Sequence, residues 1–143
     1  MKRWNGWGDD SNELDYELSS SALGFLEGLI GKSPPLPDSS LEQVLVTVPQ
    51  SRLPEHALYS VDAEDRLRHA RGQSLPDWLA LRSGDFGVFP DAVAFPQTSE
   101  EVQVLLQHAR KNQIDVIPYG GGTSVVGHIN PEENGRPVLT IDM

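Results

Sequence analysis

Residues 90–127 read PDAVAFPQTSEEVQVLLQHARKNQIDVIPYGGGTSVVG, and this stretch decides the fold. A short apolar run at 93–95 is closed by Pro96, which predicts a strand. A second apolar run at 115–118 follows a polar, periodic segment of helical length. A strand, a helix and a strand in this order predict a unit of two parallel strands joined by a right-handed crossover helix.

The helix of this unit is expected to begin at Thr98 and to end at Asn112 as its C-cap. Glu101 stands three residues after Thr98, the spacing of a capping box. Apolar residues recur at i, i+3, i+4 and i+7 and predict one buried stripe, formed by Val102, Leu105, Leu106 and Ala109.

A glycine-rich loop follows the second strand. Gly120, Gly121 and Gly122 allow positive φ and carry no Cβ, so the backbone can approach a ligand closely. Several N–H groups can then point at one anion, and Thr123 and Ser124 add hydroxyl donors. The composition of the loop predicts a phosphate or pyrophosphate site.

Two common phosphate loops do not fit this segment. The Rossmann pattern G-x-G-x-x-G fails because Val125 stands at its third glycine. The P-loop pattern fails because His128 and Ile129 follow Gly127 in place of Lys and Ser or Thr. A glycine turn that binds nothing remains the alternative at this point.

A third strand is expected at 138–142, so the fold class is α+β, with a helical N-terminal region before the sheet. Short helices are expected from a cap at Ser19, Ser20 or Ser21 to Ile30, from Ser40 to about Thr47, from about Ala63 to Arg71, and from Ser74 to Gly84. We divide the chain into an N-terminal arm with short helices at 1–60, a helical segment at 61–89, and the α/β region at 90–143.

The arm is expected to pack its larger side chains on the body: Trp4, Trp7, Leu14, Tyr16 and Leu18. A group of basic residues is expected to form a solvated helix face: Arg66, Arg68, His69, Arg71 and Arg82.

Composition narrows the functions. The 143 residues carry a formal net charge of −10, which disfavours a nucleic-acid partner. The chain has no Cys, so disulfides and thiolate chemistry are excluded, and no metal site is expected. The apolar runs are too short for a membrane span, and the N-terminus lacks a signal peptide, so a cytoplasmic location is expected.

The run P-x-G-G-G-T-S-x-x-G at 118–127, after a strand–helix–strand unit, resembles the pyrophosphate loop of the PCMH-type FAD-binding domain of the vanillyl-alcohol oxidase superfamily. Within it, the chain resembles the alkyldihydroxyacetonephosphate synthase (alkylglycerone-phosphate synthase) family and its bacterial FAD-binding oxidase relatives. The segments that carry this closer likeness are Trp4-Asn5-Gly6-Trp7-Gly8, residues 65–72, residues 79–84 and Pro90-Asp91-Ala92-Val93.

The resemblance implies a cofactor, FAD, and a set of residues around its pyrophosphate: Pro118, Tyr119, Gly120, Gly121, Gly122, Thr123, Ser124 and Gly127. Some members attach the flavin to a histidine of this loop. Gly122 and Thr123 stand at the matching positions here, which implies non-covalent FAD, and His128 is displaced. No catalytic residue can be carried over, because the Tyr and His of the synthase lie outside the matching part. His56, His69 and His108 are not their equivalents.

The resemblance implies an FAD-dependent enzyme that exchanges an acyl group for a fatty alcohol on acyl-dihydroxyacetone phosphate, in ether-lipid synthesis. An FAD-linked 2-hydroxyacid oxidase or dehydrogenase of the glycolate or D-lactate type is the alternative, and a non-catalytic truncated or split-gene remnant is the third. A lipid-like or small 2-hydroxyacid substrate, a homodimer of the full-length form and a peroxisomal location belong to these relatives. We expect an N-terminal part of such an enzyme, in which the third strand leaves an open edge at Val138–Ile141 that promotes self-association.

Overall fold

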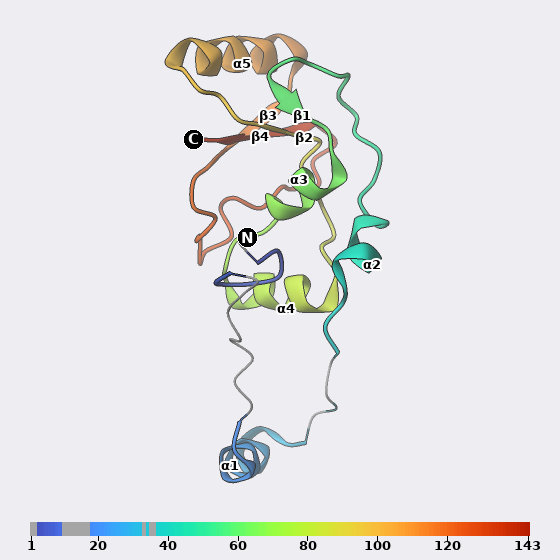
Figure 1. The fold of residues 1–143 in the computed structure, drawn as a ribbon, viewed down its shortest axis with the longest axis vertical. Helices are drawn as coiled ribbons and strands as arrows, with labels where there is room; N and C mark the ends of the chain where they lie inside the picture. The colour runs from blue at the N-terminus through green and yellow to red at the C-terminus, as the bar shows by residue number, and fades with distance from the viewer. Residues whose placement is uncertain (1–2, 10–17, 33, 35–36) are drawn as a thin grey trace.

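The computed structural model describes residues 3–9, 18–32, 34 and 37–143. Five helices and four strands follow one another in this part of the chain (Figure 1). Their bounds are α1 Ser20–Ile30, α2 Leu41–Leu45, β1 Tyr59–Ser60, α3 Ala63–Arg68, α4 Leu75–Ser83, β2 Ala92–Ala94, α5 Ser99–Asn112, β3 Asp115–Tyr119 and β4 Val138–Asp142. The α+β class expected from the sequence is confirmed.

The four strands form one mixed sheet in the order β1-β2-β4-β3. β4 lies between β2 and β3 and runs parallel to both, while β1 pairs with β2 in the antiparallel sense. The expected open edge at Val138–Ile141 is therefore wrong: these residues are buried in a central strand, and the edges are β1 and β3. The sequence did not indicate β1, which has only two residues.

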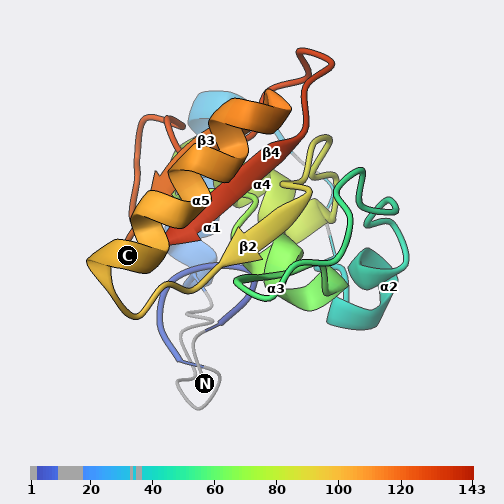
Figure 2. The ribbon, with the colours of Figure 1, turned by 90° about the horizontal axis from the view of Figure 1, so that it is seen from above.

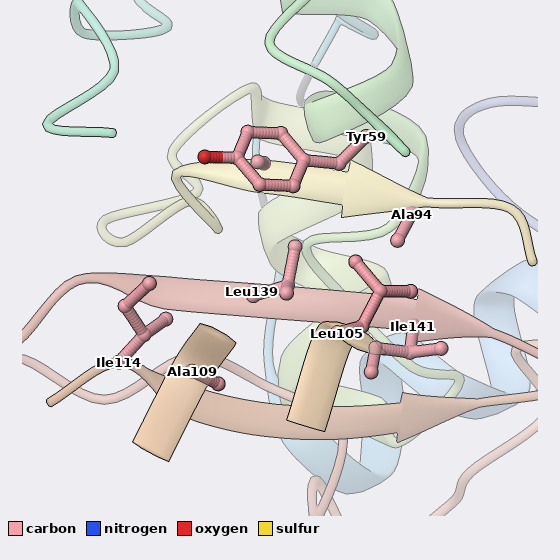
Figure 3. Close-up of a cluster of buried hydrophobic side chains, with 8 residues drawn as sticks. Tyr59, Ala94, Leu105, Ala109, Ile114, Leu139 and Ile141 are labelled. Carbon is pink, nitrogen blue, oxygen red and sulfur yellow. The ribbon is translucent and has the colours of Figure 1, made fainter. Parts of the chain in front are cut away.

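The sheet has helices on both faces. α5 lies on one face, and α3 and α4 lie on the other (Figures 1 and 2). The core between α5 and the sheet is built on Leu105, Ala109, Leu139 and Ile141, with Tyr59 of β1 at its end (Figure 3). A second apolar cluster joins α2, α3, α4 and the loop before β2: Val44, Leu67, Ala70, Leu81, Phe86 and Phe89.

The helix starts follow the capping residues. The side chains of Ser19, Ser40, Ser74 and Thr98 each accept a hydrogen bond from a backbone N–H in the first turn of the helix that follows. Ser74 and Asp77 form a capping box at the start of α4, and Gly84, with φ 77°, is its C-cap, as the expected end at Gly84 requires. α1 ends at Gly31, as expected.

Other helix details differ from the expectation. α3 ends at Arg68, three residues before Arg71, because His69 takes a non-helical conformation with φ −111° and ψ 10°. The C-cap of α5 is Gln113 rather than Asn112, since Gln113 has φ 55°. The carboxylate of Glu101 accepts from the backbone N–H of Gln97 rather than from that of Thr98, so only half of that capping box forms.

The apolar stripe of α5 is narrower than its spacing indicates. Leu105 and Ala109 are buried, whereas Leu106 is 48% exposed and Val102 is half-buried. The sheet that α5 covers is formed by short strands, so it contacts one line of side chains along the helix. The spacing identified the helix correctly but wrongly predicted that Leu106 would be buried.

The N-terminal arm packs only in part. Trp4 stacks on Phe86 with ring centroids 6.5 Å apart, while the side chains of Trp7 and Leu18 are half exposed. Leu14 and Tyr16 lie outside the described residues. The helix α1 has no buried residue.

The two leucines of α5 provide a matched test of this packing. Leu105→Ala should lower the free energy of unfolding by about 2–5 kcal/mol, because a fully buried side chain is lost and a cavity remains. Leu106→Ala should change it by less than about 0.5 kcal/mol. Urea unfolding followed by circular dichroism measures both, and equal losses would contradict the assignment of the buried face.

Candidate functional site

The glycine loop begins where two parallel strands end together. Tyr119, the last residue of β3, pairs with Asp142, the last residue of β4, and the N–H of Met143 donates to the carbonyl of Tyr119. Gly120 therefore leaves the sheet at the carboxyl edge of β3 and β4. Ligands of α/β sheets characteristically bind at this edge.

The loop glycines have different conformations. Gly122 and Gly127 have φ values of 70° and 73°, in the left-handed region that favours glycine. Gly120 and Gly121 do not have positive φ, so their value must come from the missing side chain. A Cβ on Gly120 would meet no heavy atom within 4 Å, and one on Gly121 would meet only the methyl group of Thr123 at 3.7 Å. Both glycines thus leave open space on the surface of the loop.

Several backbone N–H groups of the loop lack a hydrogen-bond acceptor. Within the part of the chain that the structure describes, the backbone N–H groups of Gly120, Gly122 and Thr123 donate to no acceptor. Ser124 Oγ lies 3.1 Å from His128 Nδ1, and the side chain of Thr123 is exposed. Amides that lack an acceptor can attract an anion through their dipoles.

Tyr119 precedes the glycine loop, and its side chain contacts other parts of the chain. Its ring is buried, its hydroxyl donates to the carbonyl of Arg68, and the ring lies 4.5 Å from that of His69. Burial, with a smaller contribution from Asp142, raises the pKa of Tyr119 to about 12. The phenol is therefore a neutral donor at ordinary pH. Pro118 is exposed within β3.

His69 was not singled out as part of the site by the sequence. Its Nδ1 lies 2.7 Å from the carbonyl oxygen of Asp65, and its Nε2 lies 3.2 Å from a carboxylate oxygen of Asp142. Both neighbours of the ring are oxygen atoms that accept hydrogen bonds. This contact ties the end of α3 to the end of β4, directly beneath the start of the glycine loop. Only the fold brings these two distant residues together.

A cavity of about 450 Å³ adjoins Gly120. Two cationic side chains and His69 line it, but four carboxylates outnumber them: Asp62, Glu64, Asp65 and Asp142. The charge of this cavity suits hydroxyl or cationic groups better than phosphate. A diphosphate therefore does not suit the charge of this cavity.

The expected solvated face of basic residues is wrong for its central members. Arg66 is 3% exposed; its Nε donates to the carbonyl of Pro90 and its Nη1 to that of Pro49, each at 2.7 Å. His69 is buried, and Nε of Arg71 is buried without a hydrogen-bond partner. Backbone carbonyls from distant loops, which the local sequence does not reveal, hold Arg66 inside.

The described residues were also compared with the requirements of a metal site and of a membrane span, and they meet neither. Among the described residues, no group of three or more His, Asp or Glu side chains is placed to hold a metal ion. No helix in those ranges is long and apolar enough to cross a membrane.

Comparison with known proteins agrees with this geometry. The family model described as "FAD binding domain" matches residues 90–143, which include the whole strand–helix–strand unit and the glycine loop. A solved structure of an alkyldihydroxyacetonephosphate synthase superposes on 99% of the chain with a TM-score of 0.77 and 30% identity.

Residues 90–143 are therefore similar to a PCMH-type FAD-binding domain.

The similarity to synthases extends through the helical first part of the chain. The alkyldihydroxyacetonephosphate synthase of Dictyostelium discoideum is 32% identical over 99% of this chain, and that of Caenorhabditis elegans is 27% identical over 99%. The chain spans 29% and 28% of the length of these two relatives, and 32% of the solved chain. A mitochondrial D-lactate dehydrogenase [cytochrome] of Arabidopsis thaliana is 39% identical, but over only 38% of this chain.

The raised pKa of Tyr119 predicts how stability depends on alkaline pH. The folded protein keeps the phenolic proton up to about pH 12, whereas an unfolded tyrosine loses it near pH 10. The folded state therefore binds more protons in this window, and this contribution to stability is lost as pH rises through it. In Tyr119→Phe, the decline of the free energy of unfolding above about pH 10 should be shallower. Urea unfolding at a series of alkaline pH values measures the slopes, and parallel slopes in the two proteins would contradict the burial of this phenol.

Proposed function

We propose that this chain binds FAD non-covalently, with the diphosphate held by the backbone of Gly120–Ser124. The observation that carries the proposal is that the backbone N–H groups of Gly120, Gly122 and Thr123 lack an acceptor in a loop that begins at the carboxyl edge of β3 and β4. Pro118, Tyr119 and Gly127 would shape the loop rather than bond the cofactor with their side chains. FAD would supply the reactive ring when bound, while this part of the chain would orient it.

The non-covalent mode is supported by the loop residues. Gly122 and Thr123 offer no side chain that attaches a flavin. His128, the nearest histidine in the loop sequence, has its Nδ1 beside Ser124 Oγ.

For the whole protein, we propose an enzyme of the alkyldihydroxyacetonephosphate synthase type. It would exchange the acyl group of an acyl-dihydroxyacetone phosphate for the alkoxy group of a fatty alcohol and release the acyl group as a fatty acid, without net oxidation. The observation in favour is that the match to synthases covers the helical first part as well as the FAD-binding part. A 2-hydroxyacid dehydrogenase is the second candidate, favoured by the higher identity over a shorter stretch. The two differ in electron flow, because only the second reaction leaves the flavin reduced.

The isolated chain should bind FAD weakly. The loop can contact only the middle of the cofactor, and each charge-assisted hydrogen bond adds a net 1.5–3 kcal/mol or so. Association costs roughly 4–15 kcal/mol in lost freedom, so a few such bonds leave a Kd on the order of 0.1–1 mM. Titration of the isotope-labelled chain with FAD, followed by amide NMR shifts, measures this range. A sub-micromolar stoichiometric complex would contradict the expected weakness, and unmoved loop amides at millimolar FAD would contradict the proposed function.

Gly121→Asp should remove whatever FAD binding the chain shows. The new carboxylate would occupy the open space in front of the loop and repel the diphosphate. Gly28→Asp on α1 is the matched control, since it adds the same charge where a Cβ meets nothing within 4 Å. The same NMR titration compares them, and equal affinities in the two variants would assign FAD to a different surface.

A further inference from the structure

The glycine loop is held from outside by a segment that lies before the FAD-binding part of the chain. The backbone N–H of Gln73 donates to the carbonyl of Ser124 at 2.5 Å. A Cβ on Gly72 would lie 2.5 Å from that same carbonyl oxygen, so no other residue fits there unless the loop moves. We call residues 72–77 the bracket.

Asn130 fastens the far side of the loop to the bracket. Its Oδ1 accepts from the backbone N–H of Gly72 at 3.1 Å, and its Nδ2 donates to Asp77 Oδ1 at 2.6 Å. The other carboxylate oxygen of Asp77 accepts from the backbone N–H and the hydroxyl of Ser74. Asp77 is 2% exposed, so each of these bonds replaces one that water would have made.

The two attachments lie on either side of the turn at Gly127. Ser124 is fixed through its carbonyl, and Asn130 through its side chain, so the segment from 124 to 130 has little freedom. Ser124 is also the last residue of the run Gly120–Ser124, which we propose to bind the diphosphate. The hydrogen bond that its carbonyl accepts from Gln73 therefore orients the residues before it. The family model matches residues 90–143 and does not include the bracket.

We propose that Gly72, Asp77 and Asn130 are positioning residues, which hold the loop in the shape that receives the diphosphate. The inference rests on the proposed function for the identity of the ligand, but the positioning itself concerns only this chain. It also gives the helical region before the sheet a role in cofactor binding.

Each hydrogen bond between Asn130 and the bracket has a fixed donor and a fixed acceptor. Asn130 must accept from Gly72 and donate to Asp77, and its amide can do both in only one orientation. In Asp77→Asn, at least one donor in the network loses its acceptor or meets another donor. In Asn130→Asp, two carboxylates face each other. The double variant D77N/N130D restores every bond, because the amide of residue 77 then donates to the carboxylate of residue 130, and the net charge is that of the wild type.

The experiment is a double-mutant cycle on the 143-residue chain, read by amide NMR. Without ligand, D77N should shift the resonances of Gly120–Ser124 and speed hydrogen exchange at Gln73, and D77N/N130D should return both toward wild type. With FAD and, separately, inorganic pyrophosphate, D77N should weaken binding roughly tenfold, and the swap should recover most of the loss. If the network only stabilised the fold, D77N would lower stability, but the double variant would not recover both the loop shifts and the affinity.

Gly72→Ala is an independent variant that tests the positioning role even if D77N or the double variant does not fold. Its new methyl group meets the carbonyl of Ser124, so the loop resonances should move and binding should weaken, while Gly28→Ala on α1 should match wild type. Folded D77N or Gly72→Ala proteins with wild-type loop shifts and exchange rates would overturn the proposal, as would a folded swap that recovers neither. If wild type binds neither ligand, the proposed function fails for this chain, and the ligand-free measurements still decide the positioning role.

Discussion

The position of β4 between β2 and β3 is the constraint on which the rest of the structure depends. Its parallel pairing on both sides buries Val138, Leu139 and Ile141 and gives α5 a surface to cover. Asp91 sets where the strand begins, since its carboxylate accepts from the N–H of Val138 and from Arg52. Burial alone would raise the pKa of Asp91, but these bonds and the charge of Arg52 hold it below its ordinary value. The ion pair thus remains formed where the central strand enters the sheet.

The same placement builds the site. Because β4 returns to the middle of the sheet, its last residue, Asp142, lies beside Tyr119 and within reach of His69. The chain between β3 and β4 must leave the carboxyl edge and come back to the opposite edge, which leaves a long segment outside the sheet. That segment would be costly to hold in one shape by itself, because each ordered residue loses roughly 1–2 kcal/mol of backbone entropy. Contacts with Gly72, Gln73 and Asp77 offset part of this cost.

Local rules predicted the parts of the fold that local chemistry decides. Ser19, Ser74 and Thr98 cap helices because their oxygens satisfy amides one turn away, and Gly84 ends α4 in the left-handed region. The apolar runs identified β2, β3 and β4 as strands but carried no information on their order, because any buried parallel strand shows the same pattern. The burial of Arg66 and the contact between His69 and Asp142 depend on partners 24 and 73 residues away. The glycine loop was found because its composition is unusual, whereas its supports at Asp77 and Asn130 are ordinary residues whose role arises only in three dimensions.

The electrostatics of the site follow from how the loop would attract its ligand. The chain carries a net charge of −10, and the cavity beside Gly120 is lined by four carboxylates, so the long-range field repels a diphosphate. The attraction must come from amide dipoles, which act over a few ångströms and depend on geometry rather than on net charge. Salt at physiological strength screens charges over about 8 Å, which reduces the repulsion and leaves contacts at hydrogen-bond distance almost unchanged. A lysine-based phosphate loop loses attraction under the same conditions. Precise placement of the loop backbone would therefore matter more here than in a site that holds its anion with cationic side chains, and this is the role that we propose for the bracket.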